Sequence, residues 1–311
     1  MTYSLPSPDQ TFKIGTRGSP LALWQAHEVR RCLRLAFDLP EAAFEIVVIK
    51  VTGDLVQDRA LKEIGGKGLF TREIEEALLD GSIDIAVHSM KDMPVLQPEG
   101  LLLDCYLERA DVRDGFVSLH ANGIADLAQG AVVGSSSLRR RAQLAHRRAD
   151  LQLVEFRGNV QTRMKKLGDG VADATFLAMA GVTRLGMAEV ARPIEVSEML
   201  PAVAQGAIGI ERRVQDARAK AMLDAIHHTE TGQQLAAERA FLARLDGSCE
   251  TPIAGLAVIE ADKLWLRGEI LRPDGSRVIS GEIRGAVADG AALGEALADQ
   301  LLTEAGAGFF D

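Results

Sequence analysis

The sequence has few cysteines and no long apolar run. Its three cysteines, Cys32, Cys105 and Cys249, are odd in number and form no CxxC pair, so we expect neither a disulfide framework nor a zinc or other metal site. No apolar run approaches the roughly 20 residues that cross a bilayer, and residues 1–10 lack the basic and apolar regions of a leader peptide. These absences predict a cytoplasmic protein that does not enter a membrane.

An overall excess of basic residues is also missing. The 311 residues include 35 Lys and Arg against 44 Asp and Glu, for a formal net charge of −9, which opposes general nucleic-acid binding. The stretch from Ser135 to Lys166 nevertheless holds nine basic and two acidic residues, and the remainder holds 26 basic and 42 acidic ones. Only Phe156 is aromatic within it, so a nucleic-acid reader that stacks bases is a weak interpretation of this stretch.

Short apolar runs alternate with helical patterns, which is typical of α/β layers around a mainly parallel sheet. Strands are predicted at 12–15, 44–51, 83–87, 101–107, 131–135, 151–156 and 173–179. Helices are predicted after Ser19 and at 67–80, 137–148 and 159–170. Two such units in succession indicate two lobes with a cleft. A short strand within 200–213 can return the chain to the first lobe. A helix over 227–245, antiparallel strands with a turn at Pro273 and a closing helix over 291–306 indicate a small α+β domain.

Arginines gather at three predicted strand-to-helix junctions. They are Arg139 and Arg140 in GSSSLRRR (134–141), Arg157 and Arg163 in FRGNVQTR (156–163), and Arg17 before Ser19 in GTRGSP (15–20). Helix N-termini and guanidiniums both favour anions, and each guanidinium presents a bidentate fork to an oxyanion. A capped surface helix with solvated arginines explains one junction equally well. Three junctions favour the binding of several carboxylates or phosphates.

The turn HSMKDMP (88–94) directly follows an apolar strand. Ser89, Lys91 and Asp92 bring a carboxylate and an ammonium to the end of that strand, where they suit electrostatic or acid/base catalysis. A surface turn with a weak ion pair is the commoner explanation of such a pattern. We interpret His88 as a buried or capping residue. GGKGLF (65–70) lacks the full spacing of a phosphate-binding loop.

The cysteines differ in their surroundings. Cys249 lies in DGSCETPIAG between glycine, serine and proline, which predicts a loop with an available thiol. Cys32, on a predicted helix, and Cys105, in an apolar strand, are interpreted as core residues. Most isolated cysteines in loops have no covalent role, so the loop position alone does not assign one to Cys249.

Seven motifs along the chain closely resemble the porphobilinogen deaminase, or hydroxymethylbilane synthase, family. In the family's order they are IGTRGSPLALWQA, IGGKGLF, DIAVHSMKDMP, GSSSLRRRAQLAHRR, FRGNVQTR, LPAVAQGAIGIE and DGSCETPIAG. The resemblance implies a cytoplasmic monomer with two lobes similar to type II periplasmic binding proteins, a central cleft and a small C-terminal α+β domain. The domains it implies are 1–107 with 208–226, 112–202, and 229–311.

The resemblance also implies an activity and its residues. The family condenses four porphobilinogens head to tail into hydroxymethylbilane, releases ammonia, and builds on a dipyrromethane cofactor attached through a thioether. The product is expected to pass to uroporphyrinogen-III synthase. The implied catalytic residue is Asp92 and the implied covalent attachment site is Cys249. Implied cofactor-binding residues are Ser89, Lys91, Asp92, Ser137, Arg139, Arg140, Arg157 and Arg184, and implied substrate-binding residues are Arg17, Ser19, Arg157 and Arg163.

Two positions depart from the family pattern. Glu63 stands where relatives often have lysine, so no anion-binding role is assigned to it, whereas Lys62 and Lys67 stay candidates. Ala204 stands where glycine is usual, in the segment that leads to the last strand of the first lobe. A two-lobed cytoplasmic receptor for a polycarboxylate or phosphate is the alternative from another class. It accounts for the arginine junctions but gives no role to Cys249.

Overall fold

Residues 4–52, 71–247 and 251–310 are described by a computed structural model of the chain. They belong to two units, one formed by residues 1–109 and 207–232 and the other by residues 110–206 and 233–311. The family resemblance implies three domains, whereas the chain divides here into two units. The boundaries of the three domains therefore stay a prediction. Among the helices in the described ranges, none combines the length and the hydrophobicity of a bilayer-crossing segment.

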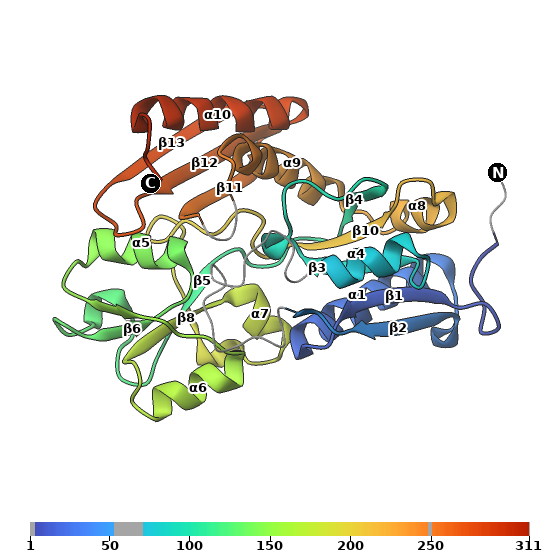
Figure 1. Ribbon diagram of the computed structural model, residues 1–311, viewed down its shortest axis with the longest axis horizontal. Helices are drawn as coiled ribbons and strands as arrows, with labels where there is room; N and C mark the ends of the chain where they lie inside the picture. Colours follow the sequence, from blue (N-terminus) through green and yellow to red (C-terminus); the bar gives the residue numbers. More distant parts are fainter. Residues whose placement is uncertain (1–3, 53–70, 248–250, 311) are drawn as a thin grey trace. The chain divides into compact units, whose positions relative to one another are not determined.

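Unit 1 is built around a five-stranded sheet with the order β2-β1-β3-β10-β4 (Figure 1). Its strands are β1 (Phe12–Arg17), β2 (Phe44–Ile49), β3 (Ile85–Ser89), β4 (Leu101–Tyr106) and β10 (Ile208–Arg213), and its helices include α1 (Pro20–Phe37), α4 (Arg72–Leu79) and α8 (Ala217–Asp224). Strand β1 pairs in parallel with β2 and β3, whereas β10 is antiparallel to β3 and β4. The chain therefore returns to the first sheet through β10, and the predominantly parallel α/β layer is confirmed.

The predicted first junction is present in unit 1. Helix α1 begins after Ser19, whose side chain accepts a hydrogen bond from the backbone of Ala22, and Pro20 occupies the first turn, where its missing N–H costs nothing. Its apolar face is buried from Ala22 to Leu33 against β1 and β3. The helix ends at Asp38, which has a φ of 51°. The Ser19 cap and the buried apolar face of α1 fix the start of the helix, and Arg17 therefore lies at the end of β1, just before it.

The lobe of unit 2 has a second five-stranded sheet with the order β7-β6-β8-β5-β9 (Figure 1). Its strands are β5 (Asp114–Ser118), β6 (Val132–Gly134), β7 (Gln152–Val154), β8 (Ala174–Ala178) and β9 (Arg192–Pro193), and its helices are α5 (Leu138–Arg147), α6 (Val160–Gly168) and α7 (Met179–Arg184). Strand β6 is parallel to β7 and β8, and β5 is antiparallel to β8 and β9. Strand β5 was not predicted from the sequence, although it lies inside the sheet.

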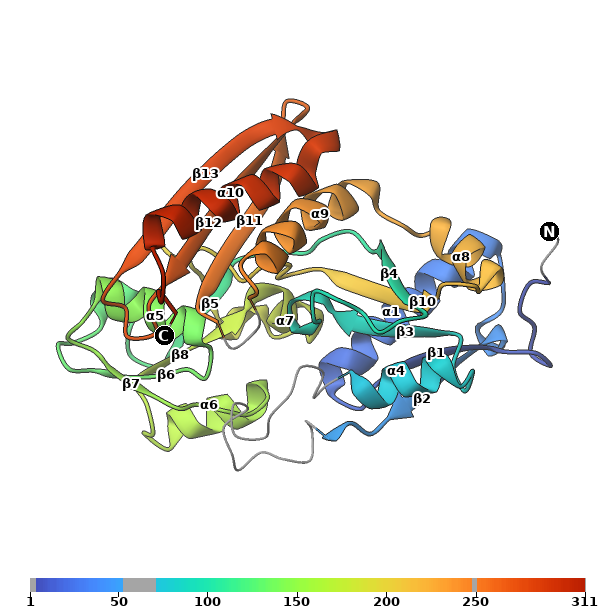
Figure 2. The same ribbon diagram turned by 45° about the horizontal axis from the view of Figure 1, so that its top comes forward.

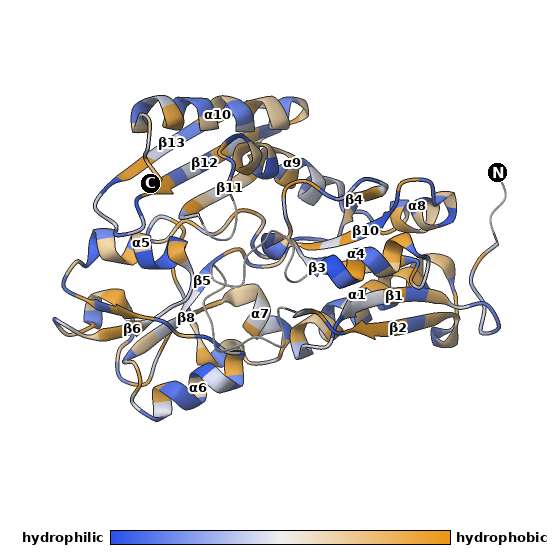
Figure 3. Cartoon of the chain, in the orientation of Figure 1, coloured by the Kyte–Doolittle hydropathy of each residue, from blue (hydrophilic) through white to orange (hydrophobic). Residues whose placement is uncertain are grey.

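The C-terminal part of unit 2 consists of an antiparallel sheet and helices, as predicted. Strands β11 (Ile253–Glu260), β12 (Lys263–Leu271) and β13 (Val278–Ala286) pair in this order, with α9 (Thr229–Arg244) and α10 (Gly290–Ala305) beside them (Figure 2). Helix α10 alternates hydrophilic and hydrophobic residues along its turns (Figure 3). Gly268 lets both helices approach β12, because a Cβ there would lie 2.5 Å from Phe241 and 3.1 Å from Leu297. The predicted fold class, two α/β lobes and a small α+β part, is confirmed.

A buried carboxylate on α9 connects two segments of unit 2. Glu238 is 0% exposed and accepts hydrogen bonds from the backbone N–H groups of Ala204, at 2.6 Å, and Ala257, at 2.8 Å. Glu238→Gln is expected to lower the free energy of unfolding by about 2–3 kcal/mol, because an amide has one acceptor oxygen and turns an NH2 group toward a buried donor. Urea denaturation of the two proteins measures this difference.

The exposed carboxylate of Glu295, on the neighbouring helix α10, provides the control for this substitution. Glu295→Gln should change the free energy of unfolding by no more than about 0.5 kcal/mol. Equal effects of the two substitutions would show that the two backbone hydrogen bonds of Glu238 contribute nothing of their own.

Candidate functional site

Unit 1 contains a pocket of about 70 Å³ at the ends of β1 and β3. It is lined by Arg17, Ser19, Leu21, Ala22, Gln25, Thr71, Val87, His88, Ser89, Asp92 and Met93. Four residues singled out from the sequence, Arg17, Ser19, Ser89 and Asp92, therefore meet in one place although they come from two separate motifs. The parallel pairing of β1 with β3 explains this, since parallel strands end at the same edge of a sheet.

Asp92 is held at the pocket by a short turn. Strand β3 continues through His88 and Ser89, and Met90–Asp92 then form one turn of 3-10 helix. Met90 is 1% exposed and its backbone N–H donates to the carbonyl of Ala207, so the turn is anchored at its first residue. The Asp92 side chain is exposed, and no residue of the described ranges donates a hydrogen bond to its carboxylate. The carboxylate is available to a ligand N–H.

The serines of the pocket are oriented by neighbouring groups. Ser89 Oγ lies 2.8 Å from Nε2 of Gln25, whose side chain is buried on α1. Ser19 Oγ lies 3.3 Å from the backbone nitrogen of Ala22 and serves as the N-cap of α1. Lys91 is half-buried and follows Ser89 directly, but it is not among the residues that line the pocket. The pocket thus combines hydroxyls and one carboxylate with the guanidinium-bearing residue Arg17.

A cluster of ionisable groups lies behind the pocket. His88 is 6% exposed, which confirms it as a buried residue, and its Nε2 lies 3.2 Å from Oε2 of Glu211 on β10. Glu75 on α4 is also buried. Burial raises the pKa of the Glu75 carboxyl, and the neighbouring charge of Glu211 raises it further. The only member of this cluster that lines the pocket is His88.

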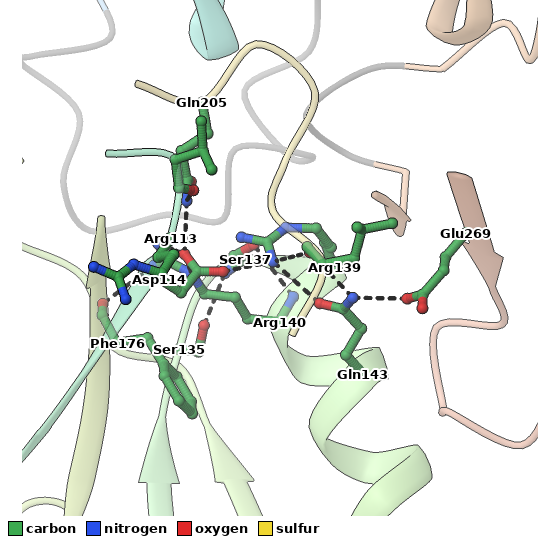
Figure 4. A network of polar contacts seen from close by, with 12 residues as sticks. Arg113, Asp114, Ser135, Ser137, Arg139, Arg140, Gln143, Phe176, Gln205 and Glu269 are labelled. Carbon is green, nitrogen blue, oxygen red and sulfur yellow. Dashed lines mark hydrogen bonds and ion pairs between the residues drawn. The ribbon is translucent and has the colours of Figure 1, made fainter. Parts of the chain in front are cut away.

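The arginine junction of α5 is organised around a carboxylate that was not predicted from the sequence (Figure 4). Asp114, the first residue of β5, is 0% exposed. Its Oδ1 accepts from Arg140 Nε at 3.0 Å, Arg140 Nη2 at 2.6 Å and Gln205 Nε2 at 3.0 Å, and its Oδ2 accepts from Arg139 Nη1 at 2.7 Å. Both guanidiniums of this junction therefore point at one carboxylate of the chain itself, that of Asp114. Burial alone would raise the pKa of Asp114, but the charges of Arg139 and Arg140 outweigh it and hold the pKa well below its usual range.

Positive charge exceeds negative charge in this cluster. Arg140 and Arg163 both donate to the backbone carbonyl of Phe176, each at 3.1 Å. Burial lowers the pKa of Arg163 to about 10, and the neighbouring charge of Arg140 contributes. Arg139 Nε is buried and has no hydrogen-bond partner within the described residues. An unpaired buried donor in a positive cluster fits a carboxylate of a ligand.

The remaining candidates of unit 2 lie near this cluster but have other contacts. Ser137 is the N-cap of α5, and its Oγ accepts from the backbone of Arg140. Arg157 is half-buried, and its carbonyl accepts from Lys166. Arg184, at the end of α7, donates to the carbonyl of Gly206 at 2.7 Å. These contacts assign no ligand to the three side chains.

Ala204, which stands where glycine is usual in the family pattern, has a backbone conformation that favours glycine. Ala204 has a φ of 61°, in the left-handed region that favours glycine, and its methyl group is buried. Such a conformation costs a non-glycine residue about 1–2 kcal/mol. The hydrogen bonds of Ala204 to Glu238 and of Gln205 to Asp114 hold the segment in this conformation.

Several predicted residues lie outside the described ranges. They are Cys249, Glu63, Lys62, Lys67 and the motif at 65–70. Of the other two cysteines, Cys105 is 2% exposed and Cys32 is half-buried against the core of unit 1, in agreement with their interpretation as core residues. Within the described part of the chain, no group of three or more His, Cys, Asp or Glu side chains suits a metal ion.

Comparison with known proteins gives a family match along most of the chain. The family model "Porphobilinogen deaminase, dipyromethane cofactor binding domain" matches residues 12–221, and "Porphobilinogen deaminase, C-terminal domain" matches residues 233–303. A curated protein named porphobilinogen deaminase, from Paracoccus denitrificans (strain Pd 1222), is 68% identical over 308 residues, which are 99% of this chain and 98% of the relative.

Two solved structures that match part of the chain are much more distant in sequence. The periplasmic aliphatic sulphonate binding protein SsuA from Escherichia coli has a TM-score of 0.42 at 15% identity. The match covers 75% of this chain and 70% of the SsuA chain. The probable amino-acid ABC transporter extracellular-binding protein ytmK from Bacillus subtilis has a TM-score of 0.40 at 15% identity. The match covers 74% of this chain and 97% of the ytmK chain.

Proposed function

This chain belongs to the porphobilinogen deaminase family, and we propose that it is a transferase that condenses four porphobilinogens head to tail into hydroxymethylbilane. Each condensation releases one ammonia, and hydrolysis releases the linear product. The dipyrromethane cofactor for which the family's main domain is named is attached through a thioether to Cys249. Identity of 68% along almost the whole chain supports the transfer of this activity.

The carboxylate of Asp92, which lines the pocket of unit 1 and has no hydrogen-bond donor among the described residues, is the observation that carries the proposal. Porphobilinogen becomes an azafulvenium cation when it loses ammonia, and the positive charge spreads onto the pyrrole nitrogen. An available carboxylate accepts a hydrogen bond from that N–H and stabilises the cation as its charge develops. Asp92 has no competing donor within the described residues and shares its pocket with Arg17, Ser19 and Ser89. We assign substrate carboxylate binding to Arg17 and Ser19.

The arginine cluster of unit 2 fits the carboxylates of a pyrrole chain. Each porphobilinogen brings an acetate and a propionate, so negative charge grows with each condensation. The buried Nε of Arg139, which has no partner in the described part of the chain, and the excess positive charge around it suit such groups. When bound, the dipyrromethane supplies the free pyrrole α-carbon at which the chain is extended. We assign cofactor binding to Ser89, Lys91, Asp92, Ser137, Arg139, Arg140, Arg157 and Arg184, and further substrate binding to Arg157 and Arg163.

The setting of the activity is part of the proposal. The family resemblance supports a monomer that works in the cytoplasm, takes porphobilinogen as its small-molecule substrate and passes hydroxymethylbilane to uroporphyrinogen-III synthase. Neither a nucleic acid nor a membrane takes part in this scheme.

The proposed function is tested by two measurements on the purified full chain. The intact mass should exceed that of the sequence by one dipyrromethane, and porphobilinogen should be consumed with release of one ammonia per molecule. Porphobilinogen bound stoichiometrically without ammonia release would instead favour the two-lobed polycarboxylate receptor. A bare mass together with no turnover, after expression in cells supplied with precursor, would overturn the enzyme assignment.

A further inference from the structure

Asp114 joins three segments of unit 2 through one carboxylate. The donors to its oxygens come from helix α5, through Arg139 and Arg140, and from the segment before β10, through Gln205. Gln205 Nε2 also donates to the carbonyl of Val112, 2.8 Å away and two residues before Asp114. The backbone of Asp114 is placed by the pairing of β5 with β8 and β9. The position of each guanidinium is therefore fixed relative to strand β5 (Figure 4).

The charges of the network do not balance within the chain. Asp114 faces two arginines, and Arg163 shares the Phe176 carbonyl with Arg140. The other carboxylate in the network, that of Glu269, accepts a hydrogen bond from Gln143 Nε2 and not from an arginine of the cluster. Three guanidiniums and two carboxylates leave one positive charge in excess. Arg139 and Arg140 are buried and Arg163 is half-buried, and because buried charge of one sign is costly unless it is paired, this excess suits an anion.

The hydrogen bonds of Arg139 show which side of its guanidinium is left for that anion. Nη1 is used by Asp114 Oδ2, by Gln143 Oε1 at 3.1 Å and by the Leu200 carbonyl at 2.9 Å. Nε, on the other edge, is buried and has no partner among the residues that the structure describes. Because a guanidinium is planar, holding Nη1 determines where the edge containing Nε and Nη2 points.

We propose that Asp114 is a positioning residue that, together with Arg140, orients Arg139 so that the edge of the Arg139 guanidinium containing Nε binds a carboxylate of the pyrrole chain. The proposal rests on the proposed function, which supplies the ligand. Asp114 itself carries the same charge as those carboxylates and is fully buried, so it acts through the arginines and does not touch the ligand. Its carboxylate selects one orientation of each guanidinium, which a neutral side chain of the same shape does not.

The test compares Asp114→Asn with the unsubstituted holoenzyme. The arginines are assigned to a cofactor that stays attached throughout turnover, so their misplacement should reduce kcat more than it raises KM. We expect kcat to fall about 10- to 100-fold, since misplacement by 1 Å has effects of this size, while KM for porphobilinogen stays within about threefold. Asp111→Asn is the matched control, because Asp111 lies three residues earlier and pairs with Arg113 near the surface. It should leave kcat within about twofold.

Asp114→Glu separates positioning from charge compensation and serves as the measurement if Asp114→Asn does not fold. It keeps the negative charge but displaces the carboxylate by one methylene. We expect it to retain most of the thermal stability and to lose kcat about tenfold or more. A kcat of Asp114→Glu equal to that of the unsubstituted enzyme overturns the proposal, and so does a folded Asp114→Asn with unchanged kcat. An unsubstituted protein without cofactor mass or turnover refutes the proposed function instead.

Discussion

Asp92→Asn should keep the covalent dipyrromethane and lose turnover by about 10²- to 10³-fold, the usual effect of removing one group that stabilises transition-state charge. The amide has nearly the shape of the carboxylate, and Asp92 is exposed with no partner to lose among the described residues, so the fold should not change. The missing negative charge no longer stabilises the cation that forms as ammonia leaves. Single-turnover ammonia release and intact mass, measured on the same preparation, check both parts of this result.

Two comparisons sharpen the test of Asp92. Asp92→Glu keeps the charge and shifts it by one methylene, so it should retain more turnover than Asp92→Asn. Glu99→Gln removes an exposed carboxylate seven residues away that does not line the pocket, and it should leave turnover unchanged. Near-normal turnover of Asp92→Asn, with the cofactor in place, would remove Asp92 from its assigned role.

The strand-to-helix junctions were predictable because their signals are local. At each of them a short apolar run is followed by a capping side chain and a helical pattern, and the structure places Ser19, Ser137 and Asn159 at the N-caps. Such caps depend only on residues within one turn of each other. These caps determine where each helix begins, and therefore where the candidate arginines lie relative to the helix start.

The partner of those arginines was not predictable in the same way. Strand β5 is five residues long, begins with Asp114 and Gly115, and pairs only with β8 and β9, whose residues are about 60 to 80 positions later. Arginines near a helix start are normally expected at the surface. Arg139 and Arg140 are 4% and 7% exposed because Asp114 is present to pair with them. An aspartate directly before an apolar run was the available signal, since a buried carboxylate requires a cationic partner.

The end of β3 shows the same dependence on distant residues. The sequence placed His88 and Ser89 in a polar turn, whereas the structure extends the strand through them, because Gly209 and Ile208 of β10 pair with these two residues. The partners lie about 120 positions along the chain, so no local pattern indicates them. The pairing matters for the site, because it carries Ser89 to the pocket and starts the Asp92 turn directly after it.

Cys249→Ala should abolish the covalent cofactor and with it all turnover. The thioether requires a nucleophilic thiolate, and the other two cysteines are unsuited to replace it. Burial raises the pKa of the Cys105 thiol, and burial also raises the pKa of Cys32, beside the carboxylate of Glu28. Both stay protonated near neutral pH. The intact mass of Cys249→Ala should therefore equal that of its sequence, even when porphobilinogen is supplied.

Cys32→Ala is the matched control for the attachment site, because it removes a half-buried thiol from helix α1 and should keep both the added mass and the turnover. A Cys249→Ala protein that still carries the dipyrromethane mass would show that another residue holds the cofactor. The pair of variants also separates attachment from binding. If Asp92 binds the pyrrole N–H and the arginine cluster binds the pyrrole carboxylates independently of the thioether, Cys249→Ala should retain a reversible affinity for porphobilinogen. Equilibrium dialysis measures that affinity, and it should weaken as salt screens the arginine charges.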